Sequence, residues 1–240
     1  MVHETIYESE TTGNKIILPL SEDWGTIGIC VSGGIDSAIL TYITGLNIAK
    51  LGLNLRIKPI SLNVANKPKY LPTARKVIAK LKSLLEKEGF NNWDTPYEGH
   101  VGIKECQEPL KLYAFRNQIN ALKWSGQIEF LFNGDTKNPS SEIRSSFHEE
   151  KEGARTEHRD EMNTVYFYHK TIRPFAFVDK RGTVEMYRKF NLVDELLPLT
   201  LSCDADRDLI DSGHPLPCGQ CWWCDERSWA LKENGLDPSL

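Results

Sequence analysis

The stretch with the clearest chemical meaning lies near the N-terminus, between two apolar runs. It reads Ser32-Gly33-Gly34-Ile35-Asp36-Ser37. Residues 26–31 before it are typical of a buried strand, and residues 38–43 after it are typical of the start of a buried helix. Two adjacent glycines let an anion approach the main chain, and the N-terminus of a helix carries partial positive charge. The sequence therefore predicts a phosphate-binding loop between a strand and a helix.

The spacing of this loop differs from two widespread nucleotide-binding motifs. No lysine lies within it, and neither Gly-x-x-x-x-Gly-Lys-Ser/Thr nor Gly-x-Gly-x-x-Gly is present. A glycine-rich turn that only reverses the chain is the simple alternative. The expected strand before the loop and the expected helix after it favour the ligand site.

A second group of reactive side chains lies near the C-terminus. Cys203, Cys218, Cys221 and Cys224 follow the spacing Cys-x14-Cys-x2-Cys-x2-Cys, and Gly219 permits the sharp turn of a metal knuckle. Four thiolates form a closed tetrahedral zinc site with a structural role. An iron–sulfur cluster uses the same ligands, and redox or packing cysteines are the other alternative.

Composition places both groups in an ordinary globular protein. The chain has 240 residues, of which 40% are hydrophobic and 26% are charged, and this suits one α/β domain with small appendages. The net charge of −4 argues against a broad nucleic-acid-binding surface. No apolar run approaches the length of a membrane span, and no signal peptide is expected, so the expected location is the cytoplasm.

Strand and helix patterns alternate along the chain. Strands are expected over residues 26–31, 54–62, 127–132 and 164–169, and amphipathic helices over residues 72–88 and 109–123. A hairpin is expected within residues 1–20. Strand–helix–strand units of this length imply a parallel sheet, whose ligands lie beyond the carboxyl ends of the strands.

Gly134 and Asp135 follow the expected strand 127–132. A glycine and an acid at a strand end suit close approach to a ligand and a contact with Mg²⁺ or ribose. A plain Asx turn explains them equally well. The next residues, 137–163, form a polar insert that we interpret as a surface helix or a flap near the site.

The loop matches the Ser-Gly-Gly-x-Asp-Ser motif of the PP-loop ATP pyrophosphatases. Those enzymes cleave ATP to AMP and pyrophosphate, usually by adenylating an oxygen of the substrate. With the cysteine pattern added, residues 26–231 resemble the 7-cyano-7-deazaguanine synthase (QueC) family of queuosine biosynthesis. This resemblance implies a Rossmann-like, doubly wound parallel sheet of the adenine nucleotide alpha hydrolase type over residues 1–200. It also implies a zinc-binding region over residues 201–240, and a homodimer.

The resemblance assigns roles to individual residues. Asp36 would orient Mg²⁺ or the loop, and Ser37 would donate to phosphate. Arg116 and Lys180 would neutralise charge on the α-phosphate or on the carboxylate of the substrate. The full set of residues implied to bind ATP is Ser32, Gly33, Gly34, Asp36, Ser37, Leu62, Asn117 and Gly134.

Two segments depart from the family pattern, and both concern the substrate. A Tyr-Pro-Asp-Cys-Arg-like segment, which helps to hold the deazapurine, is replaced by residues 135–141. Residues 63–66 stand where the family has Tyr-Gly-Gln. The sequence therefore supports the ATP half of the site and leaves the acceptor half open.

The expected reaction is the ATP-dependent conversion of 7-carboxy-7-deazaguanine with ammonia to the amide and then the nitrile. Three alternatives stand beside it. Similar proteins in bacterial antiphage gene clusters could join the deazapurine carboxylate to an amine, including a protein amine. A tRNA-thiolating PP-loop enzyme fits less well with the acidic net charge and the terminal cysteine knuckle. The third alternative is a zinc-stabilised nucleotide-binding module without catalysis.

Overall fold

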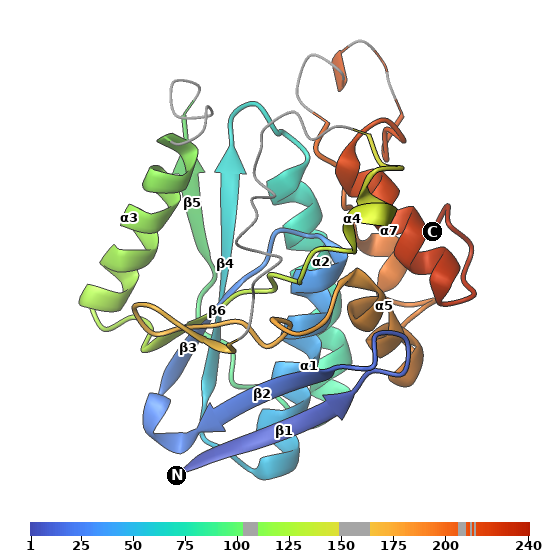
Figure 1. The fold of residues 1–240 in the computed structure, drawn as a ribbon. Coiled ribbons are helices and arrows are strands. Elements are labelled where there is room, and N and C mark those ends of the chain that lie inside the picture. Colours follow the sequence, from blue (N-terminus) through green and yellow to red (C-terminus); the bar gives the residue numbers. More distant parts are fainter. Residues whose placement is uncertain (103–109, 149–163, 206–209, 212, 214) are drawn as a thin grey trace.

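Strand β3 (Thr26–Cys30) lies inside a six-stranded sheet that has helices on both faces (Figure 1). The computed structural model describes residues 1–102, 110–148, 164–205, 210, 211, 213 and 215–240. The order along the sheet is β5-β4-β3-β6-β8-β7. All pairs are parallel except β7–β8 at one edge. The predicted doubly wound, Rossmann-like α/β fold is therefore confirmed.

The elements alternate between strand and helix through most of the chain. The other strands of the sheet are β4 (Arg56–Val64), β5 (Tyr97–Val101), β6 (Phe130–Phe132), β7 (Tyr166–Phe167) and β8 (Thr171–Ile172). The α-helices are α1 (Ile35–Leu51), α2 (Tyr70–Lys87), α3 (Leu110–Trp124), α4 (Ser141–Arg144), α5 (Lys180–Lys189) and α7 (Trp222–Glu233). Short 3-10 turns are η1 (Glu22–Trp24) and η4 (Leu197–Leu199). No helix in these described ranges is both long enough and apolar enough to cross a membrane.

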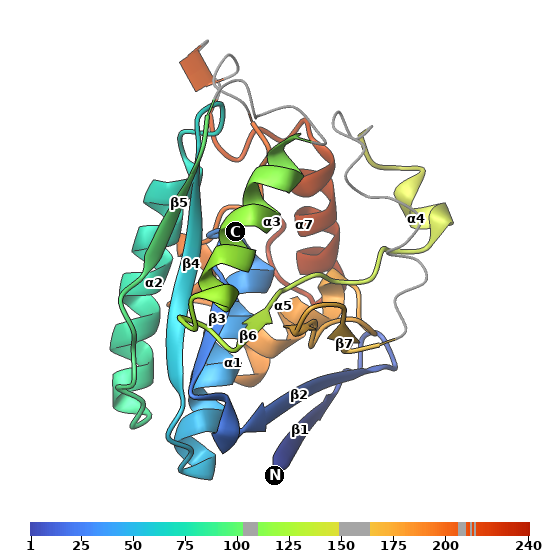
Figure 2. The ribbon, with the colours of Figure 1, turned by 90° about the vertical axis from the view of Figure 1, so that its left-hand side faces the viewer.

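The two faces of the sheet bury cores of different size. Helices α2 and α3 lie on opposite sides of β4 and β5 (Figure 2). The larger core joins α1, α2 and α5 to the sheet, while a smaller cluster around Ile119, Leu122 and Leu131 lies under α3. Helix α1 is buried along most of its length because α2 and α5 also pack against it. The loop that precedes α1 is thus attached to the most buried helix of the fold.

The sequence predicts one strand over residues 164–169, but the structure divides this region. Only Tyr166–Phe167 form a strand there, and the chain turns at His169 and Lys170, which both have positive φ. Thr171–Ile172 then enter the sheet beside β6 as the unpredicted strand β8. A strand of two residues is too short for an alternating pattern to reveal.

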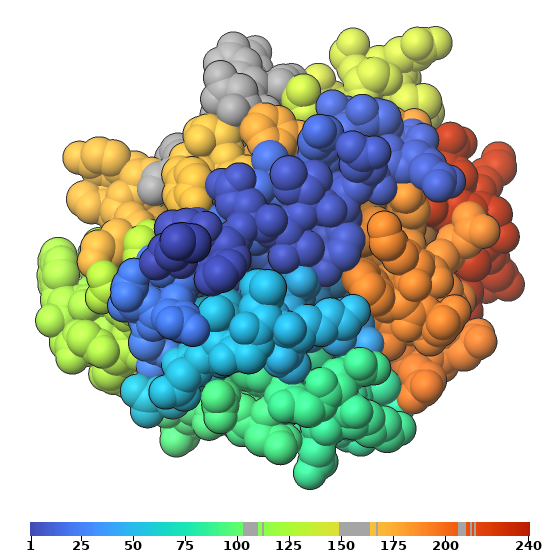
Figure 3. Space-filling model, turned by 90° about the horizontal axis from the view of Figure 1, so that it is seen from below, coloured from blue at the N-terminus to red at the C-terminus, as the bar shows by residue number. Residues whose placement is uncertain are grey.

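A separate hairpin crosses the end of the molecule opposite the carboxyl ends of β4 and β5. Strands β1 (Val2–Glu8) and β2 (Lys15–Ser21) pair antiparallel along their whole length. The hairpin lies beside the orange segment that contains α5 (Figure 3). Glu185 of α5 holds its turn, because its carboxylate accepts hydrogen bonds from the hydroxyls of Ser9 and Thr11 and from the amides of Glu10 and Thr11, at 2.7–3.1 Å.

We expect Glu185→Gln to lower the free energy of unfolding at pH 7 by about 1 kcal/mol, because the amide is a weaker acceptor for these donors. Burial raises the pKa of Glu185, but the hydrogen bonds outweigh it and hold that pKa below the ordinary value of 4.5. The carboxylate therefore stabilises the fold above pH 4.5, and this contribution is lost as pH falls through the lowered pKa.

Urea unfolding at several pH values measures this difference. Glu195→Gln is the matched control, since its partner Lys80 forms only a surface ion pair with it. A Glu185→Gln protein as stable as the wild type at pH 7 would show that the carboxylate does not anchor the hairpin.

Candidate functional site

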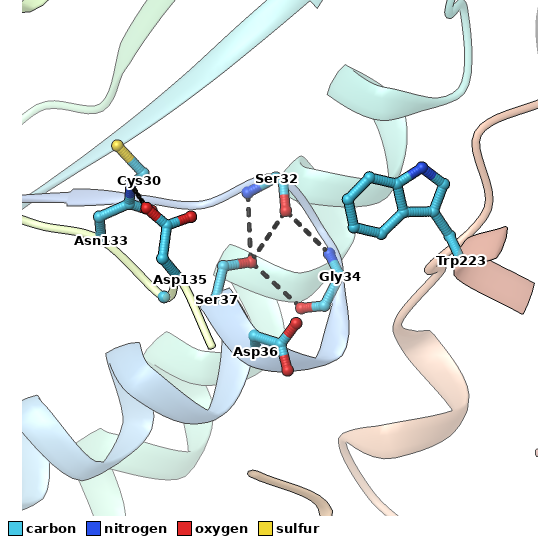
Figure 4. Close-up of a pocket in the computed structure, with 9 residues that line it drawn as sticks. Cys30, Ser32, Gly34, Asp36, Ser37, Asn133, Asp135 and Trp223 are labelled. Atoms are coloured by element: carbon cyan, nitrogen blue, oxygen red, sulfur yellow. Dashed lines mark hydrogen bonds between the residues drawn. The ribbon is translucent and has the colours of Figure 1, made fainter. Parts of the chain in front are cut away.

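The predicted phosphate loop leaves the carboxyl end of β3 and leads directly into α1. The Ser37 hydroxyl lies 3.2 Å from the amide nitrogen and from the hydroxyl of Ser32, and it donates to the carbonyl of Gly34 at 3.1 Å (Figure 4). The Ser32 hydroxyl in turn accepts from the Gly34 amide. These bonds fix the loop around the first turn of α1, whose leading N–H groups have no partner within the helix.

Two glycines are required by close packing around this loop. Gly33 has φ of +88°, and a Cβ there would lie 2.9 Å from the amide nitrogen of Ala74 in α2. A Cβ on Gly134 would lie 3.2 Å from the carbonyl carbon of Asp36 and 3.3 Å from the amide nitrogen of Ser37. Gly134 therefore lets the end of β6 approach the N-terminus of α1, while the close approach to a ligand that the sequence suggested stays a prediction.

A pocket opens beside the loop and joins segments that are distant in the sequence. Its lining residues are Cys30, Ser32, Gly34, Asp36, Ser37, Asn133, Gly134, Asp135 and Trp223. Four of the five loop residues predicted to bind ATP therefore line the same pocket as Gly134. Asn133 donates to the carboxylate of Asp135 at 2.9 Å, so this acid has a fixed orientation at the rim.

Cys30 brings a thiol to the pocket but not a nucleophile. Burial, with a smaller contribution from the Asp135 carboxylate, raises the pKa of Cys30 to about 12. The group is a neutral thiol at pH 7, and the thiolate is the reactive form. Cys30 is the last residue of β3 and packs against the small apolar cluster under α3.

Behind the loop, a buried lysine joins three helices. The ammonium of Lys180, at the start of α5, lies 2.6 Å from Asp36 Oδ2 and 3.1 Å from Oε2 of Glu226 in α7. The side chains of Lys180 and Glu226 are 2% and 0% exposed. Thr183 donates to the other oxygen of Asp36 at 2.7 Å. Asp36 is therefore held from behind by α5 while it lines the pocket in front.

Two further buried groups support the same region. The Tyr187 hydroxyl donates to the carbonyl of Ile35 at 2.7 Å, and its burial raises its pKa well above the ordinary value. Arg227 donates to the hydroxyl of Thr200 and to the carbonyls of Leu197 and Leu240. Burial lowers the pKa of Arg227, and the nearby Tyr187 and Asp36 oppose that effect. Helix α7 is thus fixed to η4 and to the C-terminus.

The four predicted metal-binding cysteines come together. The sulfur atoms of Cys203, Cys218, Cys221 and Cys224 all lie within 4.8 Å of one another. The amides of Asp204 and Cys218 point at sulfur atoms, at 3.5 and 3.4 Å. Side-chain interactions with Cys203 and then Cys224 lower the pKa of Cys221. The residues present therefore suit a thiolate-bound metal.

The cysteine segment is bonded directly to the phosphate loop. The Leu201 amide donates to the carbonyl of Gly33 at 2.9 Å, and the Ser202 hydroxyl lies 3.4 Å from the amide nitrogen of Ile35. Asp204 forms an ion pair with the buried Lys67 at 2.9 Å. The residues on both sides of Cys203 are thus tied to the phosphate loop and to the segment between β4 and α2.

Helix α7 starts within the cysteine motif and places an indole on the pocket. Trp223 lies between Cys221 and Cys224, and its ring extends toward Ser32 and Gly34 (Figure 4). The neighbouring Trp222 is buried and packs edge-on against Phe147, with ring centroids 5.1 Å apart. The described part of the polar insert therefore packs on α7; residues 149–163 lie outside the described residues.

Five predicted site residues are not among the described residues that line this pocket: Gly33, Leu62, Arg116, Asn117 and Lys180. Arg116 and Asn117 are exposed on α3, and Leu62 packs beside Val64 and Val101. Their roles stay predictions. Sequence reasoning assigned no role to Asn133, Thr183, Glu226, Ser202 or Trp223. Only Trp223 had a local signal, because a bulky aromatic residue lies inside the cysteine motif.

Comparison with known proteins adds little to this geometry. No family model matches the chain, and no curated protein matches it. One similar solved structure is an NAD+ synthetase from Burkholderia pseudomallei, with a TM-score of 0.44 and 14% identity over 73% of this chain. This chain covers 62% of that synthetase. Another is the U34-tRNA thiolase NcsA from Methanococcus maripaludis with its [4Fe-4S] cluster, with a TM-score of 0.43, 14% identity, and coverage of 88% and 73% of the two chains.

The cysteine geometry predicts about one bound metal ion per chain. We expect Cys221→Ser to lose the ion and to lower the melting temperature, because binding free energy at such a site contributes to folding. Metal analysis by mass spectrometry and thermal unfolding measure both effects. Cys30→Ala should keep the ion, since its thiol lies in β3. A Cys221→Ser protein with its full metal content would contradict the assignment.

Proposed function

We propose that this protein is an ATP-dependent enzyme of the PP-loop ATP pyrophosphatase type, which activates a carboxylate by adenylation. The observation that carries the proposal is the loop from Ser32 to Ser37. It joins the carboxyl end of β3 to the N-terminus of the most buried helix, and it faces a pocket. Helix N–H groups and the two serine hydroxyls suit the β- and γ-phosphates of ATP.

The oxygen atoms around the loop suit a magnesium ion. Asp36, Ser37 and Asp135 line the same pocket, and carboxylate and hydroxyl oxygens are the ligands that Mg²⁺ prefers. When bound, the ion would neutralise charge on the phosphates. The Ser32 and Ser37 hydroxyls, fixed by their mutual contact, would keep the pyrophosphate in the loop while the α-phosphate is exposed to attack.

The reaction that follows is balanced without a protein nucleophile. A carboxylate oxygen forms a bond to the α-phosphorus, and the bond to pyrophosphate breaks. Ammonia then attacks the acyl carbon, AMP leaves, and a proton is lost to give the amide. A second ATP adenylates the amide oxygen and releases pyrophosphate, and loss of AMP and of both amide protons then gives the nitrile. The pocket needs only to position charge and exclude water for these steps.

Lys180 has a different place in this mechanism from the one its sequence position suggests. The resemblance gives it charge neutralisation on the α-phosphate or the acid. In the structure its ammonium is buried against Asp36 and Glu226. We propose that Lys180 acts through Asp36, while Arg116 keeps its proposed contact with the phosphate or substrate.

For the metal, we propose zinc in a structural role. Four thiolates around one tetrahedral ion at about 2.3 Å must lie roughly 3.8 Å from one another. The sulfur of Cys224 lies 3.6 Å from that of Cys221 and 3.9 Å from that of Cys218. An iron–sulfur cubane places each thiolate on a different iron atom, which separates the sulfur atoms further. The spacing therefore supports a single ion.

For the acceptor, we propose a deazapurine carboxylate, most simply 7-carboxy-7-deazaguanine, with ammonia as the nucleophile. The support comes from Trp223, whose indole offers a flat surface for a planar heteroaromatic ring at the pocket. A second candidate is a reaction that stops at the amide, with an amine or a protein amine as nucleophile. Two features support this second candidate. Residues 135–141 replace the family segment that helps to hold the deazapurine, and the insert packs on α7 through Phe147.

One incubation distinguishes these candidates. The protein is mixed with ATP, Mg²⁺, 7-carboxy-7-deazaguanine and ammonium, and the products are identified by mass spectrometry. We expect AMP and pyrophosphate with the nitrile, or with the amide alone for the second candidate. If no carboxylate tested causes AMP to form, the protein is not an adenylating enzyme.

We expect Asp36→Asn to reduce AMP formation by at least about 100-fold, because a pocket carboxylate that faces the phosphates is lost. The fold should persist, since Lys180 keeps Glu226 as a partner. Circular dichroism and AMP release measure the two effects. Asp194→Asn, an exposed acid elsewhere, serves as the control. Undiminished AMP formation by the Asp36→Asn protein would remove the loop from the mechanism.

We expect Trp223→Ala to raise KM for the acid about tenfold and Trp223→Phe to change it by less than about threefold, because phenylalanine still offers a ring for stacking. KM for ATP should change little in both variants. Steady-state kinetics with each substrate varied in turn gives these constants. A larger effect on ATP than on the acid would instead place the indole against the adenine.

A further inference from the structure

Two carboxylates share one buried ammonium behind the phosphate loop. Asp36 Oδ2 and Glu226 Oε2 lie 2.6 and 3.1 Å from Lys180 Nζ. Asp36 is the only one of the three that reaches the pocket; its side chain is 20% exposed, against 2% for Lys180 and 0% for Glu226. The buried guanidinium of Arg227 is a second cation near Asp36: burial lowers its pKa, and the Asp36 carboxylate is one of the groups that oppose this effect.

Asp36 faces two competing cations when the pocket is filled. A magnesium ion in the pocket would draw the carboxylate forward, while Lys180 holds it back. If Asp36 were the sole carboxylate partner of Lys180, movement of the Asp36 carboxylate toward the pocket would leave a buried ammonium unpaired. An unpaired buried charge is strongly destabilising. Glu226 removes that obstacle, because Lys180 keeps one carboxylate whichever way Asp36 turns.

We propose that Glu226 is a positioning residue that keeps Lys180 paired and thereby frees Asp36 to bind the magnesium ion of Mg·ATP. This inference rests on the proposed function of the loop. Glu226 itself touches neither the pocket nor the phosphates; it acts through Lys180. Its place on α7, two residues after Cys224, also connects the metal-binding motif with the cation site.

The test is the magnesium dependence of nucleotide binding, which needs no turnover. Calorimetric titration of a non-hydrolysable ATP analogue is carried out in EDTA and at a series of Mg²⁺ concentrations. For Glu226→Gln, we expect the Mg²⁺ concentration that half-maximally tightens binding to rise about tenfold. Affinity in EDTA should stay within about twofold of the wild type, because the glutamine leaves the loop unchanged. A purely structural role would weaken binding equally in both conditions.

Two control variants show whether the effect is specific to the pairing of Glu226 with Lys180. Glu185→Gln removes an acid from the same helix as Lys180 without touching it, and it should keep the wild-type magnesium dependence. In a Lys180→Met background, Glu226→Gln should have no further effect, since its route of action is gone. If Glu226→Gln does not fold, Glu226→Asp replaces it, and the same rise in the magnesium requirement is expected because the shorter acid reaches Lys180 less well.

The outcomes separate the two proposals. A wild-type protein that binds the analogue, and a Glu226→Gln protein with an unchanged magnesium dependence, would overturn the role of Glu226 alone. A wild-type protein that binds no ATP analogue, with or without Mg²⁺, would overturn the proposed function and this inference together.

Discussion

The ion pairs of Lys180 are the interaction on which the site depends. A buried ammonium is tolerated only when carboxylates lie against it. Asp36 must therefore approach from α1 and Glu226 from α7, and both must meet the first residue of α5. This requirement fixes the three helices relative to one another, and it orients the loop acid that lines the pocket.

The cysteine motif belongs to the same arrangement. Sequence alone suggests a C-terminal region of its own over residues 201–240. In the structure, Leu201 and Ser202 hydrogen-bond to the loop, and Trp223 lines the pocket. A metal bound by the four cysteines would set the direction of α7, and hence the positions of both Trp223 and Glu226. The same residues would then serve stability and ligand binding.

Much of the fold could be predicted because its signals are local. The apolar run before Ser32 predicts a strand, and the glycines after it predict a loop. The periodic pattern over residues 72–88 predicts a helix, and the order of these elements along the chain predicts a parallel sheet. The cysteine cluster was predictable for the same reason, since metal ligands recur at fixed spacings. The two-residue strand β8 was missed because two residues carry no period.

The contacts behind the loop could not be predicted from the sequence. Glu226 lies 46 positions beyond Lys180, and Thr183 is an ordinary helical residue until α5 packs against α1. Which distant charged residues form ion pairs depends on how the helices pack against one another, and the spacing of residues along the sequence does not reveal it. Arg116 and Asn117, which the resemblance assigns to the ATP site, are exposed on α3, and their roles stay predictions.

We infer that the loop and the cysteine motif form one nucleotide site. Hydrogen exchange measured by mass spectrometry, with and without a non-hydrolysable ATP analogue and Mg²⁺, tests it most directly. We expect bound ligand to slow exchange in peptides that cover residues 31–38, and also in peptides that cover residues 201–205 and 222–227. Protection confined to residues 31–38, or found only elsewhere, would contradict it.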